Sequence, residues 1–416
     1  MSDVVVARSE LCGQITAMPS KSFTHRILIC SAFSDAPVIV KGVACSDDVL
    51  ATLGCLRALG AEATFIGDDC VINPIYHAKN AVLDCGESGS TLRFMLAVAS
   101  AVGGEHTFTG KGRLFERPIK GLADALSLSG VNVKVGDTLK ISGKLKGGEL
   151  LVDGSVSSQY ISGLLLASPI VGEDVKITVK GGNASRAYIK MTVDVMRAFG
   201  IAVEEAENTF FIKGGQSYKS PKEIAVEGDW SNACFFIAGG LLSGRVEIFG
   251  LNPNSLQADK NILSAINALG GKARFVGETL VVEKSSLIGG EIEVENMIDA
   301  APVLAVLCLA ASGKSVIRGV DRLRYKESDR LSAIVNMVRS AGGRADIKGN
   351  ALEILGINEP LPCKIDGEND HRIVMAAVML GGFFGGVRVT DAEAVNKSYP
   401  AFFADYRKIG GVFDEL

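Results

Sequence analysis

The sequence lacks the features that mark secreted, membrane-spanning and metal-binding proteins. Its start, MSDVVVARSEL, has neither the basic nor the apolar segment of a signal peptide, and no later apolar run reaches the roughly 18 residues of a membrane span. The nine cysteines are an odd number, with no C-x-x-C pair and no histidine at metal-ligand spacing. We therefore expect reduced, mostly buried thiols, no bound metal and a cytoplasmic location.

A large excess of charge of either sign is also missing. The 416 residues include 47 acidic and 43 basic side chains, a formal net charge of -4, so an anion site must come from local placement of lysine and arginine. Non-specific binding to nucleic acid is disfavoured. Hydrophobic residues make up 47% and charged residues 22%, close to the average of globular domains. This length predicts two or three domains.

Six copies of one pattern follow each other along the chain. In each copy a helical pattern ends at a glycine and short alternating strands follow, as in CLRALGAEATFIGDDCVI and ILSAINALGGKARFVGETLVV. The stopping glycines are Gly60, Gly130, Gly200, Gly270, Gly342 and Gly410, which lie 70, 70, 70, 72 and 68 residues apart. Glycine at a helix C-terminus adopts the left-handed conformation without a Cβ penalty. The repeat predicts an α/β protein of six helix-plus-strand units.

Two similar domains of three units each are the natural division of this repeat. Three units make about 210 residues, within the usual range for a domain. The sixth copy, FFADYRKIGGVFDEL, ends before its second strand, so the N-terminal DVVVARS is expected to complete the last domain. We predict one domain of residues 14–226 and a second of residues 1–13 plus 227–416. The two crossings, near 12–16 and 224–228, would form a hinge beside a ligand-binding cleft.

Motifs in the first half of the chain place cations and hydroxyls where helices begin. TAMPSKSFTHR and CGESGSTLRF favour anion binding through backbone N–H groups and the helix dipole. GKGRLFERPI adds cations in a glycine-rich loop, and DGSVSSQYISG and NASRAYIKMT place serines ahead of two further helices. Each motif alone could be a capped helix or a solvated loop. Their recurrence favours function.

The second half of the chain carries a denser group of charges. IDAAP places Asp299 at the start of an apolar helix, where a carboxylate is either an N-cap or a base. RYKESDR has five charges in seven residues, and on a helix Lys326 and Arg330 would be i, i+4 neighbours. A salt-bridged helix surface is the simpler explanation, although exposed pairs contribute only ~0.3–0.5 kcal/mol. ENDHR and AVNKSYP add Arg372 and Lys397.

One apparent nucleotide motif fails on inspection. CLAASGKS has Cys308 where a phosphate loop requires its first glycine, and Lys314 precedes a strand-like run instead of a long helix. No G-x-G-x-x-G occurs. Nucleotide binding of the usual kinds is not expected.

Taken together, PSKSFTHR, GESGSTLR, ERPI, SSQY, KESDR, NDHR and NKSYP, in this order and at these intervals, resemble the 5-enolpyruvylshikimate-3-phosphate synthase family over nearly the whole chain. The family's fold, two domains each of three repeated units in an inside-out α/β barrel, agrees with the repeat found above. The resemblance implies transfer of the enolpyruvyl group of phosphoenolpyruvate to the 5-hydroxyl of shikimate 3-phosphate, with release of phosphate, on the route to chorismate and aromatic amino acids. It implies a monomer without cofactor or metal, acting on small molecules, with no nucleic-acid or membrane partner.

The resemblance also assigns residues to the two substrates. Shikimate 3-phosphate would be bound by Lys21, Ser22, Arg26, Ser157, Ser158, Gln159, Ser185, Asp299 and Lys326. Phosphoenolpyruvate would be bound by Lys21, Gly89, Arg117, Gln159, Arg330, Arg372 and Lys397. Each substrate carries a phosphate and a carboxylate, so the motif cations would balance about five or six negative charges. Because both predicted domains contribute, domain closure would assemble the site.

Three side chains are expected to act on the reacting atoms. The 5-hydroxyl adds to C2 of the enol while C3 gains a proton, and the tetrahedral intermediate then loses a C3 proton and phosphate, which requires an acid and a base. Asp299 is the candidate base for the hydroxyl, and Glu327 is the candidate for proton transfer at C3. Lys21 would stabilise the intermediate.

Two alternatives stay open at this point. The sister enolpyruvyl transferase acting on UDP-N-acetylglucosamine has a loop cysteine in a G-C-x-I-G-x-R-P context, where this chain reads KGRLFERP with Gly112 at the thiol position. A non-catalytic anion-binding protein on the same fold would not need Asp299 and Glu327 together with the cations. The chain departs from the family pattern at Glu87, Ser90 and Arg322.

Overall fold

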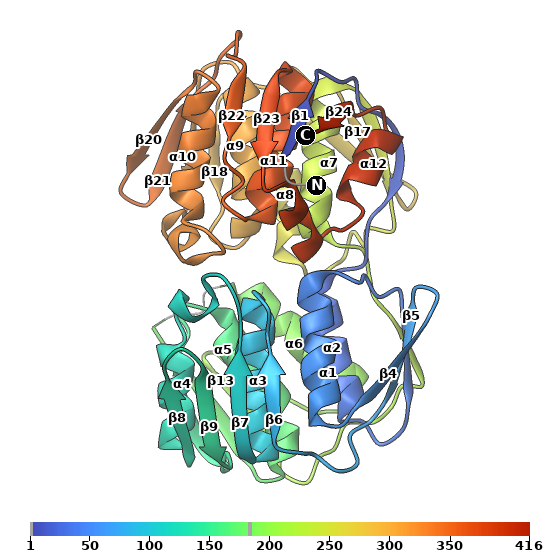
Figure 1. The fold of residues 1–416 in the computed structure, drawn as a ribbon, viewed down its shortest axis with the longest axis vertical. Helices are drawn as coiled ribbons and strands as arrows, with labels where there is room; N and C mark the ends of the chain where they lie inside the picture. Colours follow the sequence, from blue (N-terminus) through green and yellow to red (C-terminus); the bar gives the residue numbers. More distant parts are fainter. Residues whose placement is uncertain (1–2, 182–184) are drawn as a thin grey trace. The chain divides into compact units, whose positions relative to one another are not determined.

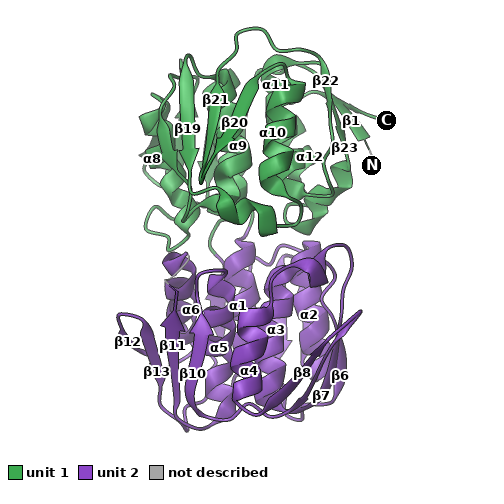
Figure 2. Cartoon of the chain, turned by 90° about the vertical axis from the view of Figure 1, so that its left-hand side faces the viewer, with its two compact units in different colours: residues 1–18, 227–416 green, residues 19–226 purple. Residues whose placement is uncertain are grey.

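The computed structural model describes residues 3–181 and 185–416, and the chain divides into two compact units (Figure 2). Unit 1 comprises residues 1–18 and 227–416, and unit 2 comprises residues 19–226. Both units mix helices and strands along their whole length (Figure 1).

One strand at each crossing pairs with a sequence-distant part of the chain. Strand β2, Cys12–Thr16, precedes unit 2 in the sequence but pairs in parallel with β15, Arg245–Phe249, of unit 1. Strand β14, Glu223–Ala225, ends unit 2 and pairs in parallel with β3, Val38–Lys41, from its beginning. The boundary predicted after residue 13 therefore falls inside a paired strand, and its pairing keeps the rest of that strand in unit 1.

Six four-stranded sheets follow one plan, in which a parallel pair of strands is extended by an antiparallel pair. Unit 2 contains β14-β3-β5-β4, β6-β7-β9-β8 and β10-β11-β13-β12, and unit 1 contains β16-β17-β15-β2, β18-β19-β21-β20 and β22-β23-β1-β24. The remaining strands of unit 2 are β4 (Glu62–Ile66), β5 (Asp69–Asn73), β6 (Ala81–Asp84), β7 (Gly104–Thr109), β8 (Val131–Val135), β9 (Leu139–Gly143), β10 (Gly148–Asp153), β11 (Val175–Lys180), β12 (Glu204–Ala206) and β13 (Thr209–Ile212). Those of unit 1 are β1 (Asp3–Val6), β16 (Lys272–Val276), β17 (Thr279–Glu283), β18 (Glu291–Glu293), β19 (Lys314–Arg318), β20 (Arg344–Lys348), β21 (Ala351–Leu355), β22 (Cys363–Ile365), β23 (Val387–Thr390) and β24 (Phe413–Glu415).

The helices alternate between two kinds. One kind ends at the six predicted glycines, and comprises α2 (Asp47–Leu59), α4 (Lys120–Leu128), α6 (Arg186–Ala198), α8 (Ile262–Ala268), α10 (Arg330–Ser340) and α12 (Phe402–Lys408). All six glycines have positive φ, between 78° and 118°, the conformation that a residue without Cβ adopts most readily. The predicted six-unit repeat is thus confirmed, and with it the α/β fold class.

The other kind of helix forms the core of each unit. It comprises α1 (Lys21–Ala32), α3 (Gly89–Val102), α5 (Ser158–Val171), α7 (Trp230–Ser243), α9 (Ala301–Ala310) and α11 (His371–Phe384). These helices are buried on nearly all sides. Most of their sequences, such as APVLAVLCLA in α9, are apolar all round instead of along one stripe, whereas α1 also buries Thr24, His25 and Arg26. Each repeat holds a second helix and a parallel pair of strands that the predicted pattern of one helix and two strands did not include.

The sixth sheet includes both ends of the described chain. Strand β1 lies between β23 and β24 and pairs antiparallel with each of them. Its Val4 and Val6 are fully buried against the core of unit 1. Across the described residues, no helix is both long and apolar enough to cross a membrane. All nine cysteines are unpaired thiols, and most of them are buried.

Candidate active site

Several of the predicted site residues of unit 2 lie where its core helices begin. Lys21 and Ser22 open α1, Gly89 opens α3, and Ser157 and Ser158 open α5. Each is followed by an apolar run that fixes the helix in the core, so the polar first turn is placed at the core's edge. Backbone N–H groups of a first helical turn lack intrahelical acceptors and favour anions.

Lys21 is held by a carboxylate of the neighbouring helix. Its Nζ lies 2.7 Å from Oδ2 of Asp48 in α2, and both side chains are almost buried, at 13% and 11% exposure. A charge pair at this depth is stronger than one in water, because the surrounding medium screens it less. Asp48 was not predicted as a site residue. The aspartates of SDDVL that open α2 were the available signal.

Arg26 is almost fully buried. Its guanidinium donates to Oγ1 of Thr192 at 2.7 Å and to the carbonyl oxygen of Ser22 at 2.7 Å, and it lies over the ring of Phe94. Burial lowers the pKa of Arg26 to about 10. In this conformation the side chain, which is 2% exposed, ties α1 to α5 and α6.

Gln159 sits in a hydrogen-bonded chain between α3 and α5. Arg93 donates to its Oε1 at 2.6 Å, and its Nε2 donates to Oγ of Ser90 at 2.7 Å. Arg93 also donates to the carbonyl oxygen of Pro118 at 3.1 Å. Ser90, one of the departures from the family pattern, thus supplies a hydroxyl acceptor at this position. Gln159 was predicted from the sequence as a site residue, whereas Arg93 was not.

Gly89 and Arg117 are in direct contact. A Cβ atom built on Gly89 would lie 2.6 Å from Cζ and from one terminal nitrogen of Arg117. Any side chain at this position would therefore have to displace the guanidinium. The loop before α4 and the start of α3 are positioned together by this contact.

The serines predicted to bind phosphate occupy helix starts. Ser157 caps α5 and accepts a hydrogen bond from the backbone N–H of Gln159 at 3.2 Å. Ser158 and Ser185 are buried, and Ser185 has a φ of 56° just before α6. The motif NASRAYIKMT begins outside the described residues, with Asn183 and Ala184.

In unit 1 the predicted residues form one charged cluster centred on Arg330. Its guanidinium lies 2.7 Å from Oδ1 of Asp299 and 2.5 Å from Oε2 of Glu327, and the side chain is fully buried. Lys326 reaches the same Oδ1 of Asp299 at 3.0 Å. The segment RYKESDR is not one helix: a 3-10 turn ends at Tyr325 and α10 begins at Arg330. The two cations converge through the intervening loop, and not as i, i+4 neighbours.

Asp370 is as deeply buried as Arg330 in this cluster. It is fully buried and accepts from Nε of Arg330 at 2.9 Å and from a terminal nitrogen at 3.1 Å. Ser328 donates to it at 3.0 Å, and it caps α11 by accepting from the backbone N–H of Arg372 at 2.9 Å. Asp370 lies within the motif ENDHR but was not predicted as a site residue. A carboxylate directly before an apolar helix was the signal.

Arg372 and Lys397 complete the cationic side of the cluster. Arg372 is buried and its Nε lies 3.6 Å from Oδ1 of Asp299. Lys397 donates to the carbonyl oxygen of Asn369 at 2.6 Å, in the turn before α11. Both side chains therefore belong to the region around the start of α11.

Burial and charge shift the pKa values in this cluster in different directions. Burial alone would raise the pKa of Asp299, but Arg372, Lys326 and Arg330 outweigh it and hold that pKa well below its ordinary value. Burial lowers the pKa of Lys326 to about 8, although Asp299 opposes the shift. Asp299 is thus ionised at neutral pH, and Lys326 can exchange a proton at a pH near neutral. The described residues contain no group of three or more potential metal-binding His, Cys, Asp or Glu side chains.

The whole chain is similar to one group of known proteins. The family model of EPSP synthase (3-phosphoshikimate 1-carboxyvinyltransferase) matches residues 5–406. A 3-phosphoshikimate 1-carboxyvinyltransferase of Clostridium perfringens is 35% identical, with 99% of each chain covered, and one of Methanocorpusculum labreanum is 34% identical, with 98% of each covered. Among solved structures, EPSP synthase from Acinetobacter baumannii has a TM-score of 0.82 at 23% identity, covering 100% of both chains. The enolpyruvyl transferase NikO from Streptomyces tendae has a TM-score of 0.79 at 16% identity, covering 99% of this chain and 98% of its own.

Proposed function

Because the chain belongs to the EPSP synthase (3-phosphoshikimate 1-carboxyvinyltransferase) family, we propose that it transfers the enolpyruvyl group of phosphoenolpyruvate to the 5-hydroxyl of shikimate 3-phosphate and releases phosphate. The observation that carries this proposal is the family match over residues 5–406, together with the cluster of Asp299, Lys326, Glu327 and Arg330.

The start of the core helices in unit 2 is proposed to bind shikimate 3-phosphate. Ser157, Ser158 and Ser185 hold its phosphate, since all three lie at helix starts, where N–H groups favour anions. Lys21 and Ser22, with Arg26 behind them, face its hydroxyl and carboxylate side. Gln159, fixed by Arg93 and Ser90, lies between the two substrates.

Phosphoenolpyruvate is proposed to bind arginines and lysines from both units. Arg117, seated on Gly89, belongs to unit 2, whereas Arg330, Arg372 and Lys397 belong to unit 1. Arginine binds carboxylate and phosphate through two parallel hydrogen bonds, each worth ~1.5–3 kcal/mol when charged. Because the ligands of one substrate are divided between the units, closure of the units on the substrates is part of the proposal.

Asp299 is proposed as the base that accepts the proton of the 5-hydroxyl. In the free protein its pKa is held low by Arg372, Lys326 and Arg330, which makes it ionised but a weak base. Anionic substrates neutralise these cations when they bind, and the pKa of Asp299 then rises toward the range useful for proton transfer. Binding of the substrates thus activates the base.

Proton transfer at C3 is assigned to Glu327, which is 17% exposed beside Lys326. As the oxygen of the 5-hydroxyl bonds to C2, C3 gains a proton and a tetrahedral phosphate intermediate forms. Loss of a C3 proton and cleavage of the C2–O bond to phosphate restore the enol ether. Lys21 stabilises the intermediate, and the leaving phosphate is neutralised by lysine and arginine side chains, so the proposal invokes no metal or organic cofactor. The protein is further proposed to act as a cytoplasmic monomer on small molecules, without nucleic-acid or membrane partners.

Release of phosphate tests this proposal directly. With phosphoenolpyruvate and shikimate 3-phosphate we expect one phosphate per enolpyruvyl product, and with UDP-N-acetylglucosamine in place of shikimate 3-phosphate we expect none. Gly112, at the position of the catalytic loop cysteine of the sister enzyme, supports this preference. Turnover with UDP-N-acetylglucosamine, and none with shikimate 3-phosphate, would contradict the proposal.

Two variants test the assigned roles. Asp299→Ala is expected to lower kcat far more than it weakens shikimate 3-phosphate binding, whereas Asp321→Ala, an exposed aspartate of the same unit, should leave both unchanged. Equal losses of kcat and binding would indicate a structural aspartate. Lys21→Met is expected to abolish most turnover, and near-normal turnover would show that the assigned anion site is wrong.

A further inference from the structure

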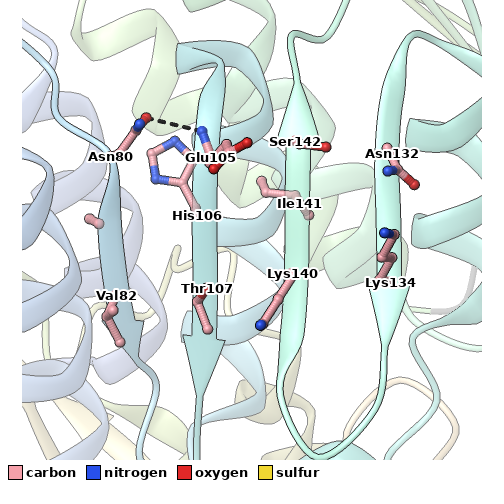
Figure 3. A pocket seen from close by; sticks show the side chains of 11 residues that line it. Asn80, Val82, Glu105, His106, Thr107, Asn132, Lys134, Lys140, Ile141 and Ser142 are labelled. Carbon is pink, nitrogen blue, oxygen red and sulfur yellow. Dashed lines mark hydrogen bonds between the residues drawn. The ribbon is translucent and has the colours of Figure 1, made fainter.

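A hollow of about 480 Å³ lies on the sheet β6-β7-β9-β8 of unit 2 and shares no lining residue with the proposed substrate sites (Figure 3). Its floor carries Thr107 from β7, Lys140 and Ser142 from β9, and Asn132 and Lys134 from β8. Nothing in the proposed reaction uses these side chains.

The two lysines of the hollow occupy paired positions on neighbouring strands. Lys134 and Lys140 are direct partners in the register of β8 and β9, and Figure 3 shows both on adjacent strands. Directly opposed like charges destabilise an antiparallel pair. Within the described residues, neither ammonium group has a salt-bridge partner, because the salt bridges of unit 2 involve other side chains.

The other five sheets are built differently. Each has at least one ion pair between neighbouring strands, and these pairs are Lys41–Glu223, Lys176–Glu149, Arg245–Glu283, Arg318–Glu291 and Arg388–Asp3. The sheet with the hollow has no such pair among its strands, which the structure describes throughout. Five of the sheets therefore carry paired opposite charges, whereas the sheet β6-β7-β9-β8 carries two cations without such a pair.

The rest of the hollow offers hydrogen-bonding groups of both kinds. Thr107 lies opposite Lys140, and Ser142 lies opposite Asn132, so hydroxyl and amide donors adjoin the lysines. The far end holds an acceptor, the carboxylate of Glu105. His106 pairs with the buried Ile141 in the register of β7 and β9, so its ring lies on the core face of the sheet, where Nε2 donates to the carbonyl oxygen of Gly103.

Glu105 lies at this end of the hollow because it is opposite Ser142 in the register of β7 and β9. The hollow thus has a cationic end that suits an anion and an acceptor end that suits hydroxyl groups.

We propose that this hollow binds a phosphorylated polyol, with the phosphate between Lys134 and Lys140 and the hydroxyls toward Glu105. A phosphate monoester carries close to two negative charges and three acceptor oxygens, which matches two ammonium groups with hydroxyl donors beside them. A dianion placed there removes the repulsion between the lysines. The carboxylate of Glu105 repels a second anionic group at the other end, which disfavours ligands with two separated anions.

Glycerol 3-phosphate is a suitable probe, and backbone amide NMR shifts locate its binding. We expect saturable shifts at residues 105–107, 132–134 and 140–142, weakening with added salt, and weaker binding of inorganic phosphate, which lacks the hydroxyls. Shifts at the proposed substrate site are separate signals from other residues. Failure of the proposed enzymatic activity would therefore leave this test unaffected.

Lys134→Glu is the decisive variant, because it creates an opposite-charge pair with Lys140 like those of the other sheets. We expect an unchanged or slightly raised melting temperature, unchanged basal turnover and loss of the shifts on this sheet. Lys176→Gln on β11, which removes an exposed ion-paired lysine, should keep them. Three results would overturn the proposal. Glycerol 3-phosphate could cause no saturable shifts, it could cause equal shifts in Lys134→Glu and in the unmodified protein, or sodium chloride alone could cause equal shifts.

Discussion

Replacing Arg330 by methionine tests whether the charged cluster of unit 1 depends on one buried guanidinium. Arg330 and Asp370 are both fully buried and share two hydrogen bonds of 2.9 and 3.1 Å. Breaking such a pair leaves an uncompensated buried carboxylate, at a cost of roughly 3–5 kcal/mol. Asp299 and Glu327 also lose a partner, but they are 25% and 17% exposed, so water replaces part of that interaction. We therefore expect the buried pair to dominate the loss.

Urea unfolding followed by tryptophan fluorescence measures this loss in the correct unit. The chain has a single tryptophan, Trp230, which is fully buried in α7 of unit 1. With an m-value of about 2 kcal/mol/M, the Arg330→Met midpoint should fall by about 1.5–2.5 M. Adding Asp370→Asn should recover part of this shift, because it removes the unpaired charge.

A matched control separates this effect from the loss of any arginine. Arg318→Met removes a 51% exposed arginine that is paired with Glu291, and its midpoint should fall by no more than about 0.5 M. Similar shifts for Arg318→Met and Arg330→Met would refute the reasoning. So would a loss for Arg330→Met that Asp370→Asn fails to reduce.

Three further predictions concern catalysis. Burial lowers the pKa of Lys326 to about 8, so its positive charge is present below that pH and is lost above it. The kcat/KM for the anionic substrates should therefore fall about tenfold per pH unit above pH 8, and in Lys326→Arg the plateau of kcat/KM should extend to higher pH. Gly89→Ala should raise KM for phosphoenolpyruvate more than it lowers kcat, because its Cβ meets a guanidinium at 2.6 Å, whereas Gly54→Ala, whose Cβ meets nothing within 4 Å, should leave both constants unchanged. Asp48→Asn releases Lys21 from its 2.7 Å ion pair and should lower kcat/KM by about tenfold, or ~1.4 kcal/mol. An unchanged kcat/KM would contradict this prediction.

The repeat could be predicted because its signal is local. A helix that ends at a glycine and a hairpin that follows depend on neighbouring residues, and the positive φ of all six glycines, from Gly60 to Gly410, reflects that local requirement. The six core helices were harder to place in the repeat. Most of their sequences are apolar all round, so periodicity says little about which neighbours they contact.

The partners of the site residues could not be predicted in the same way. Asp370 meets Arg330 from 40 positions away, and Arg93 meets Gln159 from 66 positions away. These contacts depend on how the core helices pack against each other, and no local sequence pattern contains that information. Similarly, RYKESDR reads as a helix surface, but its lysine and arginine turn toward Asp299, which begins a different helix. The assignment of these residues to the two substrates stays a prediction.

By itself, the sequence determined the six repeats, the α/β class and the placement of charged motifs at helix starts, since capping, turn formation and hydrophobic patterning act over a few residues. Only the tertiary structure decided that Asp370 neutralises Arg330 in the core of unit 1, and that Lys134 and Lys140 oppose each other across two strands. Charges interact through space and not along the chain, so their balance appears only when helices pack and strands adopt their register.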